Sequence, residues 1–537
     1  MKPRFIILSG RGCSGKSTLA RLLGEKAQAH LIKSSDILRN TEKLEIRSAE
    51  QLARIAKTQE RKTGGAWLAN QVNTLIMYSP PTESTIVVDS VQTVQQVNLL
   101  RQSGWPITHV HLRAGETAVA GRRTRRMASS SNARGDASQS SYSDAYAKRL
   151  ESIADVVIDT DRCNEYDVFA RVAARLEVRP VTAEPLVDVL VGGQYGSEGK
   201  GNIVHYLAPE YDVLVRVGGP NAGHKVFRAG EKPYTFHQLP SGALANRDAM
   251  LVIGAGAVIN LEHLLKEIGE LNINYDKLII DPQAMIIDGS DVEWESKTLK
   301  AAIGSTAQGV GAATARKILY RRPDSSVMLA KDVRELKHYI KDSVEYFASC
   351  LSRRQRVMLE GTQGTSLSLH HGHYPHVTSR VTSATGCLAE AGLSARHVRR
   401  VVMVCRTYPI RVGNTDVGNT SGFMSQEISV DEISRRSGIP LEELKRTETT
   451  STTHRPRRIA EFDWAQLRRS LLLNGPTDIA LTFADYFGIA NRKAFRYEQL
   501  NAETLRFIEE MEKVSGIPVS MISTAFNERN IIDRRMW

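Results

Sequence analysis

The chain has 537 residues, 41% of them hydrophobic, with 71 Lys and Arg against 59 Asp and Glu and a formal net charge of +12. This length exceeds what one hydrophobic core usually organises, so the composition predicts two or more globular domains. The basic residues are scattered and form no long block. The charge therefore fits small polyanionic substrates as well as it fits nucleic acid, and we do not expect a nucleic-acid partner.

The cysteines and the N-terminus indicate the compartment. The five cysteines lie far apart without C-x-x-C spacing, which is typical of reduced thiols. The apolar stretch near the N-terminus is too short for a signal peptide or a membrane span. We therefore expect a soluble cytoplasmic protein with no membrane partner.

The N-terminal stretch predicts a phosphate-binding loop. An apolar strand over 5–8 precedes residues 10–17, GRGCSGKS, which fit G-x-x-x-x-G-K-[ST], and a helical pattern follows over 18–26. In that context backbone amides cradle phosphates, the lysine reaches the β and γ phosphates, and the last serine binds Mg2+. We predict that ATP, or alternatively GTP or dATP, binds here with Mg2+ through Gly10, Gly12, Ser14, Gly15, Lys16, Ser17 and Thr18.

Two further segments of this half fit a P-loop fold. Residues 85–88 form a β-rich run that ends at Asp89, where such a fold places an acidic metal ligand; a simple turn residue is the alternative. Residues 34–36, Ser-Ser-Asp, follow a strand predicted over 31–33. They either contact an acceptor nucleotide or cap the next helix.

A basic segment near residue 120 predicts a lid. Residues 121–126, GRRTRR, follow a strand predicted over 109–113 and precede a Ser-rich segment at 129–143. Arginines beside a flexible stretch are typical of a lid that clamps transferring phosphates; a solvated basic loop is the alternative. With a last strand at 154–159 and a last helix at 165–176, residues 1–176 resemble the nucleoside monophosphate kinase group of P-loop kinases. The resemblance implies phosphorylation of a nucleotide or deoxynucleotide.

A linker separates this half from the rest. Residues 177–186, EVRPVTAEPL, hold two prolines and interrupt the periodicity. We expect two α/β domains, residues 1–176 and 187–537, each with a mainly parallel sheet flanked by helices.

Two glycine-rich turns stand out in the second half. An apolar strand predicted over 187–191 leads into a turn that ends in EGKG (198–201), and a second over 213–217 leads into a turn with Asn221 and His224. Glycines let backbone N–H groups approach an anion closely, and a following helix adds the positive end of its dipole. This combination predicts phosphate chemistry, and tight packing of a turn is the alternative for each.

The two turns, GQYGSEGKG and GGPNAGHK, resemble the active-site signatures of the adenylosuccinate synthetase family. The family's later blocks follow in order as IGSTAQGVG (303–311), EGTQGTSLSLHHGHYPHVTS (360–379), RTYPIRVGN (406–414), TTHRPRR (452–458) and LTFADYF (481–487). The resemblance covers about 350 residues. It implies that a nucleoside triphosphate phosphorylates the 6-oxygen of a purine monophosphate and that L-aspartate displaces this phosphate, with Mg2+, in a homodimer.

The resemblance also implies the roles of individual residues. The positions of the catalytic groups are Ser197, Lys200, His224 and Gln363, with Ser197 and Gly223 at the metal. The positions that hold the triphosphate are Glu198, Gly199, Gly201 and, for its base, Asp485. The positions that hold the purine monophosphate and aspartate are Asn221, Ala222, Ser305, Thr306, Arg321, Thr378, Val412, Thr453, Arg455 and Arg457. Arg321 is placed only by its closeness to an arginine that the family donates across its dimer.

The chain departs from the family at several of these positions. Ser197 replaces the aspartate that acts as base toward the purine and binds magnesium. His454 replaces the glycine before the arginines, and Phe483 replaces a lysine near Asp485, which puts guanine specificity of the donor in doubt. Ala525-Phe526 replaces the usual Gly-Pro of the C-terminal block.

The serine directs the substrate hypothesis. It removes a carboxylate and makes room for, or accepts a hydrogen bond from, a 2-amino group. The same replacement marks the phage branch of the family that makes 2-aminoadenine from dGMP, so we expect dGMP as the acceptor. The alternatives are an ordinary synthetase acting on IMP, a nucleotide-sensing protein without catalysis, and a nucleic-acid-modifying activity of residues 1–176.

Overall fold

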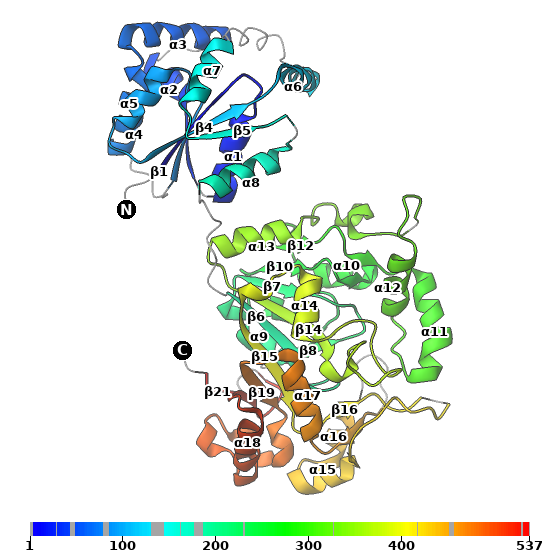
Figure 1. Ribbon diagram of the computed structural model, residues 1–537. Helices are drawn as coiled ribbons and strands as arrows, with labels where there is room; N and C mark the ends of the chain where they lie inside the picture. Colours follow the sequence, from blue (N-terminus) through cyan, green and yellow to red (C-terminus); the bar gives the residue numbers. More distant parts are fainter. Residues whose placement is uncertain are drawn as a thin grey trace. The chain divides into compact units, whose positions relative to one another are not determined.

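The computed structural model describes residues 4–27, 29–42, 49–78, 85–129, 144–161, 163–176, 186–228, 231–325, 327–415, 417–449, 456–527 and 530–535. The chain forms two compact units, Met1–Thr182 and Ala183–Trp537. The predicted linker lies outside the described residues except for Leu186. Each unit is an α/β fold built on a mainly parallel sheet, as the sequence predicts (Figure 1).

The first unit contains five parallel strands in the order β2-β3-β1-β4-β5. The strands are β1 (Arg4–Gly10), β2 (His30–Lys33), β3 (Thr85–Asp89), β4 (Ile107–Arg113) and β5 (Val156–Asp159). The helices are α1 (Lys16–Ala27), α2 (Ser34–Glu42), α3 (Ala49–Thr63), α4 (Ala66–Tyr78), α5 (Val94–Arg101), α6 (Glu116–Ser129), α7 (Asp144–Ser152) and α8 (Glu165–Arg175). Alternate residues of β1 enter two separate apolar clusters, so both faces of the sheet are covered.

Two segments of this unit for which the sequence left alternatives open are helical. Residues 121–126 lie within α6, so the solvated basic loop that we considered is wrong. Ser34 is the first residue of α2, which begins directly after β2. Most of the predicted Ser-rich segment, residues 130–143, lies outside the described part of the chain.

The second unit contains nine strands in the order β12-β10-β7-β14-β6-β15-β19-β20-β21, parallel except for the last pair. They are β6 (Val187–Gly192), β7 (Val213–Arg216), β10 (Met250–Ile253), β12 (Leu278–Ile280), β14 (Val357–Gly364), β15 (Val398–Arg406), β19 (Asp478–Thr482), β20 (Val519–Ser523) and β21 (Ile531–Asp533). Smaller sheets pair β8 (His224–Val226) with β9 (Tyr234–Phe236), β11 (Val258–Ile259) with β13 (Met285–Ile286), and β18 (Arg458–Ala460) with β16 (Ile410–Arg411) and β17 (Glu427–Ile428).

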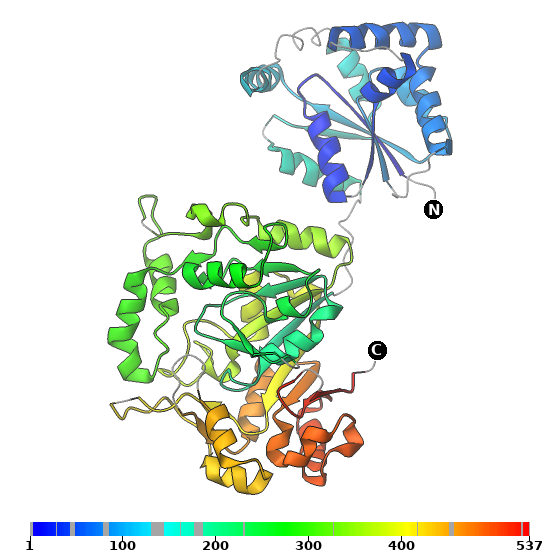
Figure 2. The ribbon, with the colours of Figure 1, turned by 180° about the vertical axis from the view of Figure 1, so that it is seen from behind.

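Helices cover both faces of the large sheet (Figures 1 and 2). They are α9 (Lys200–Leu207), α10 (Leu261–Glu270), α11 (Gly289–Ile303), α12 (Val310–Leu319), α13 (Ser343–Ser352), α14 (Ala384–Ala391), α15 (Val430–Ser437), α16 (Leu441–Thr447), α17 (Trp464–Asn474) and α18 (Ala502–Ser515). Because the central strands are buried on both faces, they are continuous apolar runs, which explains why β6 and β7 are visible in the sequence.

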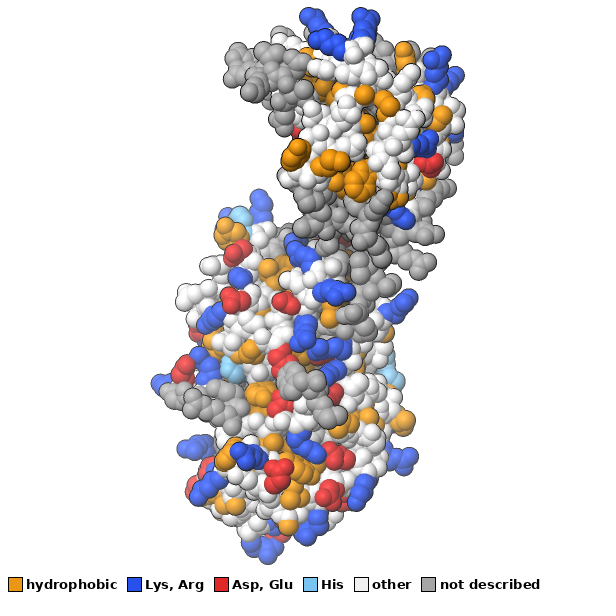
Figure 3. All heavy atoms as spheres, turned by 90° about the vertical axis from the view of Figure 1, so that its left-hand side faces the viewer, with side chains coloured by type: hydrophobic (Ala, Val, Ile, Leu, Met, Phe, Trp, Pro, Cys, Tyr) orange, Lys and Arg blue, Asp and Glu red, His pale blue; other side chains and the backbone are white. Residues whose placement is uncertain are grey.

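The surface charge and the length of the helices relate to the expectations about nucleic-acid and membrane partners. On the face drawn in Figure 3, Lys and Arg side chains of the second unit are interspersed with Asp and Glu. Within the described ranges, no helix is both long and apolar enough to cross a membrane.

Candidate active site

A cavity of about 780 Å³ opens in the second unit, beside the carboxyl ends of parallel strands. The turns after β6 and β7, the end of β14 and the residues after β19 all contribute to its wall. This is where parallel α/β sheets bind ligands. The predicted residues that line it are Ser197, Gly199, Lys200, Gly201, Asn221, Ala222, Gly223, His224, Ser305, Thr306, Gln363, Thr378, Val412, Arg457 and Asp485.

Two described residues that the sequence predicts for this site, Glu198 and Arg321, are not in its wall. Glu198 is fully buried beneath it. Arg321 follows α12 at the exposed surface, where its Nε donates to the carbonyl of Ile318 at 2.7 Å. Thr453 and Arg455 lie outside the described residues.

The first glycine-rich turn is shaped by Glu198. Its Oε1 accepts hydrogen bonds from the backbone N–H groups of Gln194 at 3.1 Å and Gly196 at 2.6 Å, and its Oε2 accepts from the Lys200 ammonium at 2.8 Å. Gly199, with φ of 84°, begins α9 without a side-chain cap. The first turn of α9 therefore has no side-chain cap, and helix N-termini of this kind can bind anions.

His224 is held from behind by a buried carboxylate. Its Nδ1 pairs with Oε1 of Glu360, a fully buried residue of β14, and the backbone N–H of Ser241 donates to Oε2 of Glu360 at 2.8 Å. Burial and the nearby Arg216 guanidinium lower the pKa of His224 to about 4. Burial alone would raise the pKa of Glu360, but the His224 ring and Arg216 hold it at about 2.

The pairing with Glu360 determines whether Nε2 of His224 accepts a hydrogen bond from a ligand or donates one to it. Because Glu360 is ionised, Nδ1 carries the proton, and Nε2 of the neutral ring is left as an acceptor. Nε2 is buried and has no hydrogen-bond partner among the described residues. It becomes a donor only when a ligand anion favours the imidazolium, which is the form needed to support an oxygen that gains charge.

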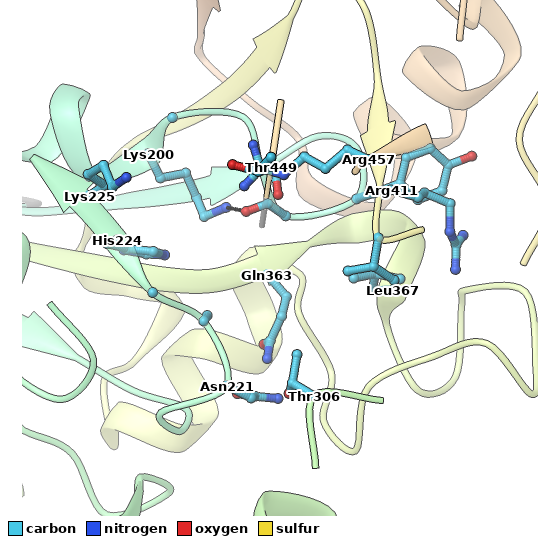
Figure 4. Close-up of a pocket in the computed structure, with 18 of the residues that line it drawn as sticks. Lys200, Asn221, His224, Lys225, Thr306, Gln363, Leu367, Arg411, Thr449 and Arg457 are labelled. Carbon is cyan, nitrogen blue, oxygen red and sulfur yellow. Dashed lines mark hydrogen bonds between the residues drawn. The ribbon is translucent and has the colours of Figure 1, made fainter. Parts of the chain in front are cut away.

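A polar group lies on another side of the cavity. Asn221, Thr306 and Gln363 lie together there, apart from Lys200 and Lys225 (Figure 4). Gln363 has a left-handed backbone, with φ of 56°. Within the described structure, Nε2 of Gln363 and Oδ1 of Asn221 are buried without partners. Buried polar atoms without partners indicate a ligand, and strained backbone of this kind is frequent at functional sites.

Arg457 is positioned by a buried ion-pair cluster. Its Nη1 lies 3.6 Å from Oε2 of Glu448, while Nη2 of the buried Arg406 lies 2.7 Å from Oε1. Its backbone N–H also donates to the carbonyl of Glu448 at 3.0 Å. The cluster brings a guanidinium to the cavity where the family resemblance implies recognition of aspartate carboxylates.

The end of the cavity near β19 is aromatic. The Arg406 guanidinium lies 3.9 Å from the centre of the Phe483 ring, and the Phe526 ring lies 5.6 Å from Phe483. Asp485 is ion-paired with Arg492 at 2.9 Å, and burial raises the pKa of its carboxyl to about 6 in spite of that partner. Asp485 is therefore a weaker partner for a guanine base than a free carboxylate.

The P-loop of the first unit has the predicted strand, loop and helix. Gly10 has φ of 143°, and a Cβ there would lie 2.4 Å from the carbonyl oxygen of Leu112, so only glycine fits. The Lys16 ammonium donates to the carbonyls of Gly10 at 2.9 Å and Arg11 at 2.8 Å. Burial lowers the pKa of Lys16, and the Asp89 carboxylate opposes this effect.

A second cavity lies beside this loop. It measures about 690 Å³ and is lined by Arg11, the β4–α6 connection and α7. The other predicted P-loop residues precede or begin α1, with Ser17 and Thr18 in its first turn.

Each of the two predicted magnesium sites, one in each unit, offers only a few protein oxygens as ligands. Among the residues that the structure describes, no three His, Cys, Asp or Glu side chains come together to hold a metal ion. Mg2+ that is bound mainly by phosphates and water needs only one or two protein oxygens. Hydroxyls of Ser17 and Ser197, the Asp89 carboxylate and the Gly223 carbonyl are such oxygens, so the residues present fit the ion.

Three site residues were missed by the sequence analysis. Glu360 stands in a quoted block, but its pairing with His224 depends on β14 lying beside β7, which no local pattern reveals. Glu448 is likewise a long-range partner. Lys225 follows directly after His224 and lines the cavity.

Known proteins that resemble this chain belong to the family whose signatures line the cavity. The sequence profile described as adenylosuccinate synthetase matches residues 189–323 and 324–492. The adenylosuccinate synthetase of Methanocaldococcus jannaschii is 36% identical over 355 residues, which cover 65% of this chain and 96% of that protein. The enzyme of a Pyrococcus species is 35% identical over 358 residues, or 98% of its length.

Two solved structures share the fold of the second unit. The succinoaminodeoxyadenylate synthetase of cyanophage S-2L, bound to dGMP and to dATP as an energy donor, is 27% identical, with a TM-score of 0.54 over 66% of this chain and 96% of that one. Fully ligated adenylosuccinate synthetase from Plasmodium falciparum is 23% identical, with a TM-score of 0.56 over 65% of this chain and all of that one. The profile match spans more than half of the sequence, and the chain therefore belongs to the adenylosuccinate synthetase family.

Proposed function

We propose that the second unit joins L-aspartate to the 6-position of dGMP through a 6-phosphoryl intermediate. The observation that carries this proposal is Ser197, which lines the cavity where the family signature has an aspartate. A serine there leaves space beside the base and offers a hydroxyl that accepts from a 2-amino group. The structural neighbour from cyanophage S-2L, which holds dGMP, supports the same choice.

Different residues of the cavity are proposed to act in the two steps of the reaction. The 6-oxygen takes the γ-phosphoryl group of the triphosphate, the amino group of aspartate then attacks C6, and phosphate leaves with that oxygen. The N–H groups at the start of α9 bind phosphate, while His224 in its charged form supports the 6-oxygen. Thr306, Gln363 and Thr378 hold the 5′-phosphate side. Ser197 and the Gly223 carbonyl would hold Mg2+, which supplies charge neutralisation on the triphosphate when it is bound.

Amino-acid recognition is assigned to the arginines after α16. Arg457 reaches the cavity from its ion pair with Glu448, and a planar guanidinium matches a carboxylate in two-point hydrogen bonding. Thr453 and Arg455 are the further predicted contacts. The second unit is proposed to act as a homodimer, to which Arg321 contributes.

We propose further that the first unit is a kinase for a nucleotide or deoxynucleotide. The strand, P-loop and helix, with Asp89 acting on Lys16, support the binding of a triphosphate with Mg2+. Arg122 of α6 donates to Oγ1 of Thr160 at 3.0 Å, so this part of the predicted lid touches the residues that follow β5. ATP is the expected donor for both units.

The acceptor is tested by product analysis. The full chain is incubated with aspartate, Mg2+ and ATP or GTP, and with dGMP, GMP, IMP or dIMP, and the products are weighed by mass spectrometry. A succinyl adduct on dGMP is expected. An adduct on IMP alone would show that the protein is an ordinary adenylosuccinate synthetase. Stabilisation against heat by nucleotides without any adduct would favour a nucleotide-sensing protein.

A further inference from the structure

The strand that carries His224 crosses the start of α9. A Cβ added to Gly201 would lie 3.1 Å from the Cβ of His224 and 3.2 Å from the carbonyl oxygen of Lys225, so β8 is packed against the first turn of α9. In β8 the side chains of His224 and Val226 are buried, while Lys225 is exposed and lines the cavity. The Lys225 side chain therefore emerges beside the electropositive end of α9.

The two lysines of this region differ in their partners. The Lys200 ammonium is almost fully buried and is matched by Oε2 of Glu198 at 2.8 Å, so its positive charge is already balanced. Within the described part of the chain, the Lys225 ammonium has no carboxylate within 4.0 Å, and it lies 5.9 Å from the centre of the Phe227 ring. Lys225 thus brings a charge to the cavity that no described side chain neutralises.

We propose that Lys225 binds the triphosphate of the phosphoryl donor and is the main side-chain cation for it in the second unit. This inference rests on the proposed function of the site. An ammonium beside free helix N–H groups is a strong phosphate site, because the charge and the amides act on the same oxygens. Nε2 of the adjacent residue His224 is buried without a partner in the described structure, and such an atom is suited to meet a ligand.

The alternative ligand is the 5′-phosphate of the purine monophosphate. The geometry favours the triphosphate, because Asn221, Thr306 and Gln363 lie together on another side of the cavity, away from Lys200 and Lys225 (Figure 4). Lys225 is therefore expected to affect the Michaelis constant of the donor and not that of the acceptor.

The test compares Lys225→Met with Lys225→Arg in the full chain. Both carry Lys16→Met, which removes the P-loop lysine of the first unit from the measurement. Lys337→Met is the matched control, since Lys337 is an exposed lysine outside the cavity. Aspartate-dependent phosphate release is measured with the triphosphate and dGMP varied separately. The Lys225 and Lys337 variants are expected to unfold at the same temperature as Lys16→Met alone, because the side chains of Lys225 and Lys337 are exposed.

Lys225→Met is expected to raise the KM for the triphosphate about 10- to 100-fold, the worth of one charged hydrogen bond. Lys225→Arg and Lys337→Met are expected to change it less than about threefold, and the KM for dGMP is expected to stay within the same range. An unchanged KM for the triphosphate, or a rise confined to dGMP, would overturn the proposal.

A binding measurement separates this proposal from the reaction. A non-hydrolysable ATP analogue with Mg2+ is titrated calorimetrically into the same Lys16→Met proteins without purine or aspartate. Weaker binding by Lys225→Met supports the role of Lys225 even if no purine is converted, in which case only the proposed reaction fails. Equal binding by Lys225→Met and Lys337→Met overturns the role of Lys225 whatever the reaction proves to be.

Discussion

Ser197 is the residue on which we propose that substrate choice depends. It lines the cavity between the two glycine-rich turns, and its backbone carbonyl accepts from the buried Arg406 at 3.5 Å. The backbone is thus fixed by the surrounding turn, and the side chain is free to differ. A carboxylate at this position would attract an N–H group of the purine ring, but it would fill the space that the 2-amino group of dGMP needs.

Restoring the carboxylate is expected to reverse the preference. Ser197→Asp should lower kcat/KM for dGMP about 10- to 100-fold and raise it for IMP, since one misplaced polar group is worth about that much in selectivity. The ratio of kcat/KM for the two purines is the measurement. Ser197→Ala is the control, and it should retain the preference for dGMP. If Ser197→Asp leaves the ratio unchanged, Ser197 does not choose the acceptor.

The pairing of His224 with Glu360 predicts a pH-dependent stability. The folded pKa of His224, about 4, lies below its usual value of 6.5, so the unfolded chain binds the extra proton first as the pH falls. Glu360, with its pKa at about 2, adds a loss below its usual value of 4.5. The free energy of unfolding of the second unit should therefore decrease from pH 6.5 downward, by up to about 3 kcal/mol from His224.

Chemical denaturation between pH 7 and pH 4 measures this decrease. His224→Asn removes the ring that titrates and should flatten the profile between pH 6.5 and 4.5. A variant profile as steep as that of the parent would show that other groups cause the decrease.

At the scale of elements, the sequence predicts the strands and their turns well. Strands such as β6 and β7 are buried on both faces, so they appear as apolar runs, and their glycine-rich turns are fixed by local backbone needs. The short β8–β9 hairpin and the helical form of residues 121–126 are not predicted from the sequence. The partners of His224 and Arg457 come from distant strands and helices, so no local pattern shows them.

The close contact between α9 and β8 predicts that a methyl group added at Gly201 affects both catalysis and stability. Gly201→Ala should lower kcat about tenfold and destabilise the unit by about 1–3 kcal/mol, since the added Cβ meets His224 and the carbonyl of Lys225 at 3.1–3.2 Å. Gly269→Ala in α10 is the control, because a Cβ there meets nothing within 4 Å. It should stabilise the protein by about 0.5–1 kcal/mol with unchanged kcat. Equal kinetics of the two variants would contradict the tight contact.

At the scale of the whole molecule, each unit has its own hydrophobic core. The clusters of the first unit involve residues from Phe5 to Leu176, and the large clusters of the second involve residues from Val187 to Ile532. Each unit thus meets the main requirement for folding alone. The sequence predicts this division from the two prolines of the linker, although it does not indicate how the units cooperate.

Separating the units is expected to separate the activities. Residues 183–537 alone should keep aspartate-dependent phosphate release within about threefold of the full chain, because the cavity is lined by that unit. Lys16→Met in the full chain should abolish phosphorylation of a nucleoside monophosphate and leave the release unaffected. Loss of both activities in Lys16→Met would show that the P-loop serves the ligase reaction.

In the proposed reaction, the 6-oxygen of dGMP leaves as phosphate. This step is tested most directly with dGMP that carries 18O at the 6-position, incubated with the full chain, aspartate, Mg2+ and ATP. Mass spectrometry should find one 18O in the released phosphate and none in the succinyl adduct, because aspartate displaces the phosphorylated oxygen. Unlabelled phosphate, or conversion of IMP without conversion of dGMP, would contradict it.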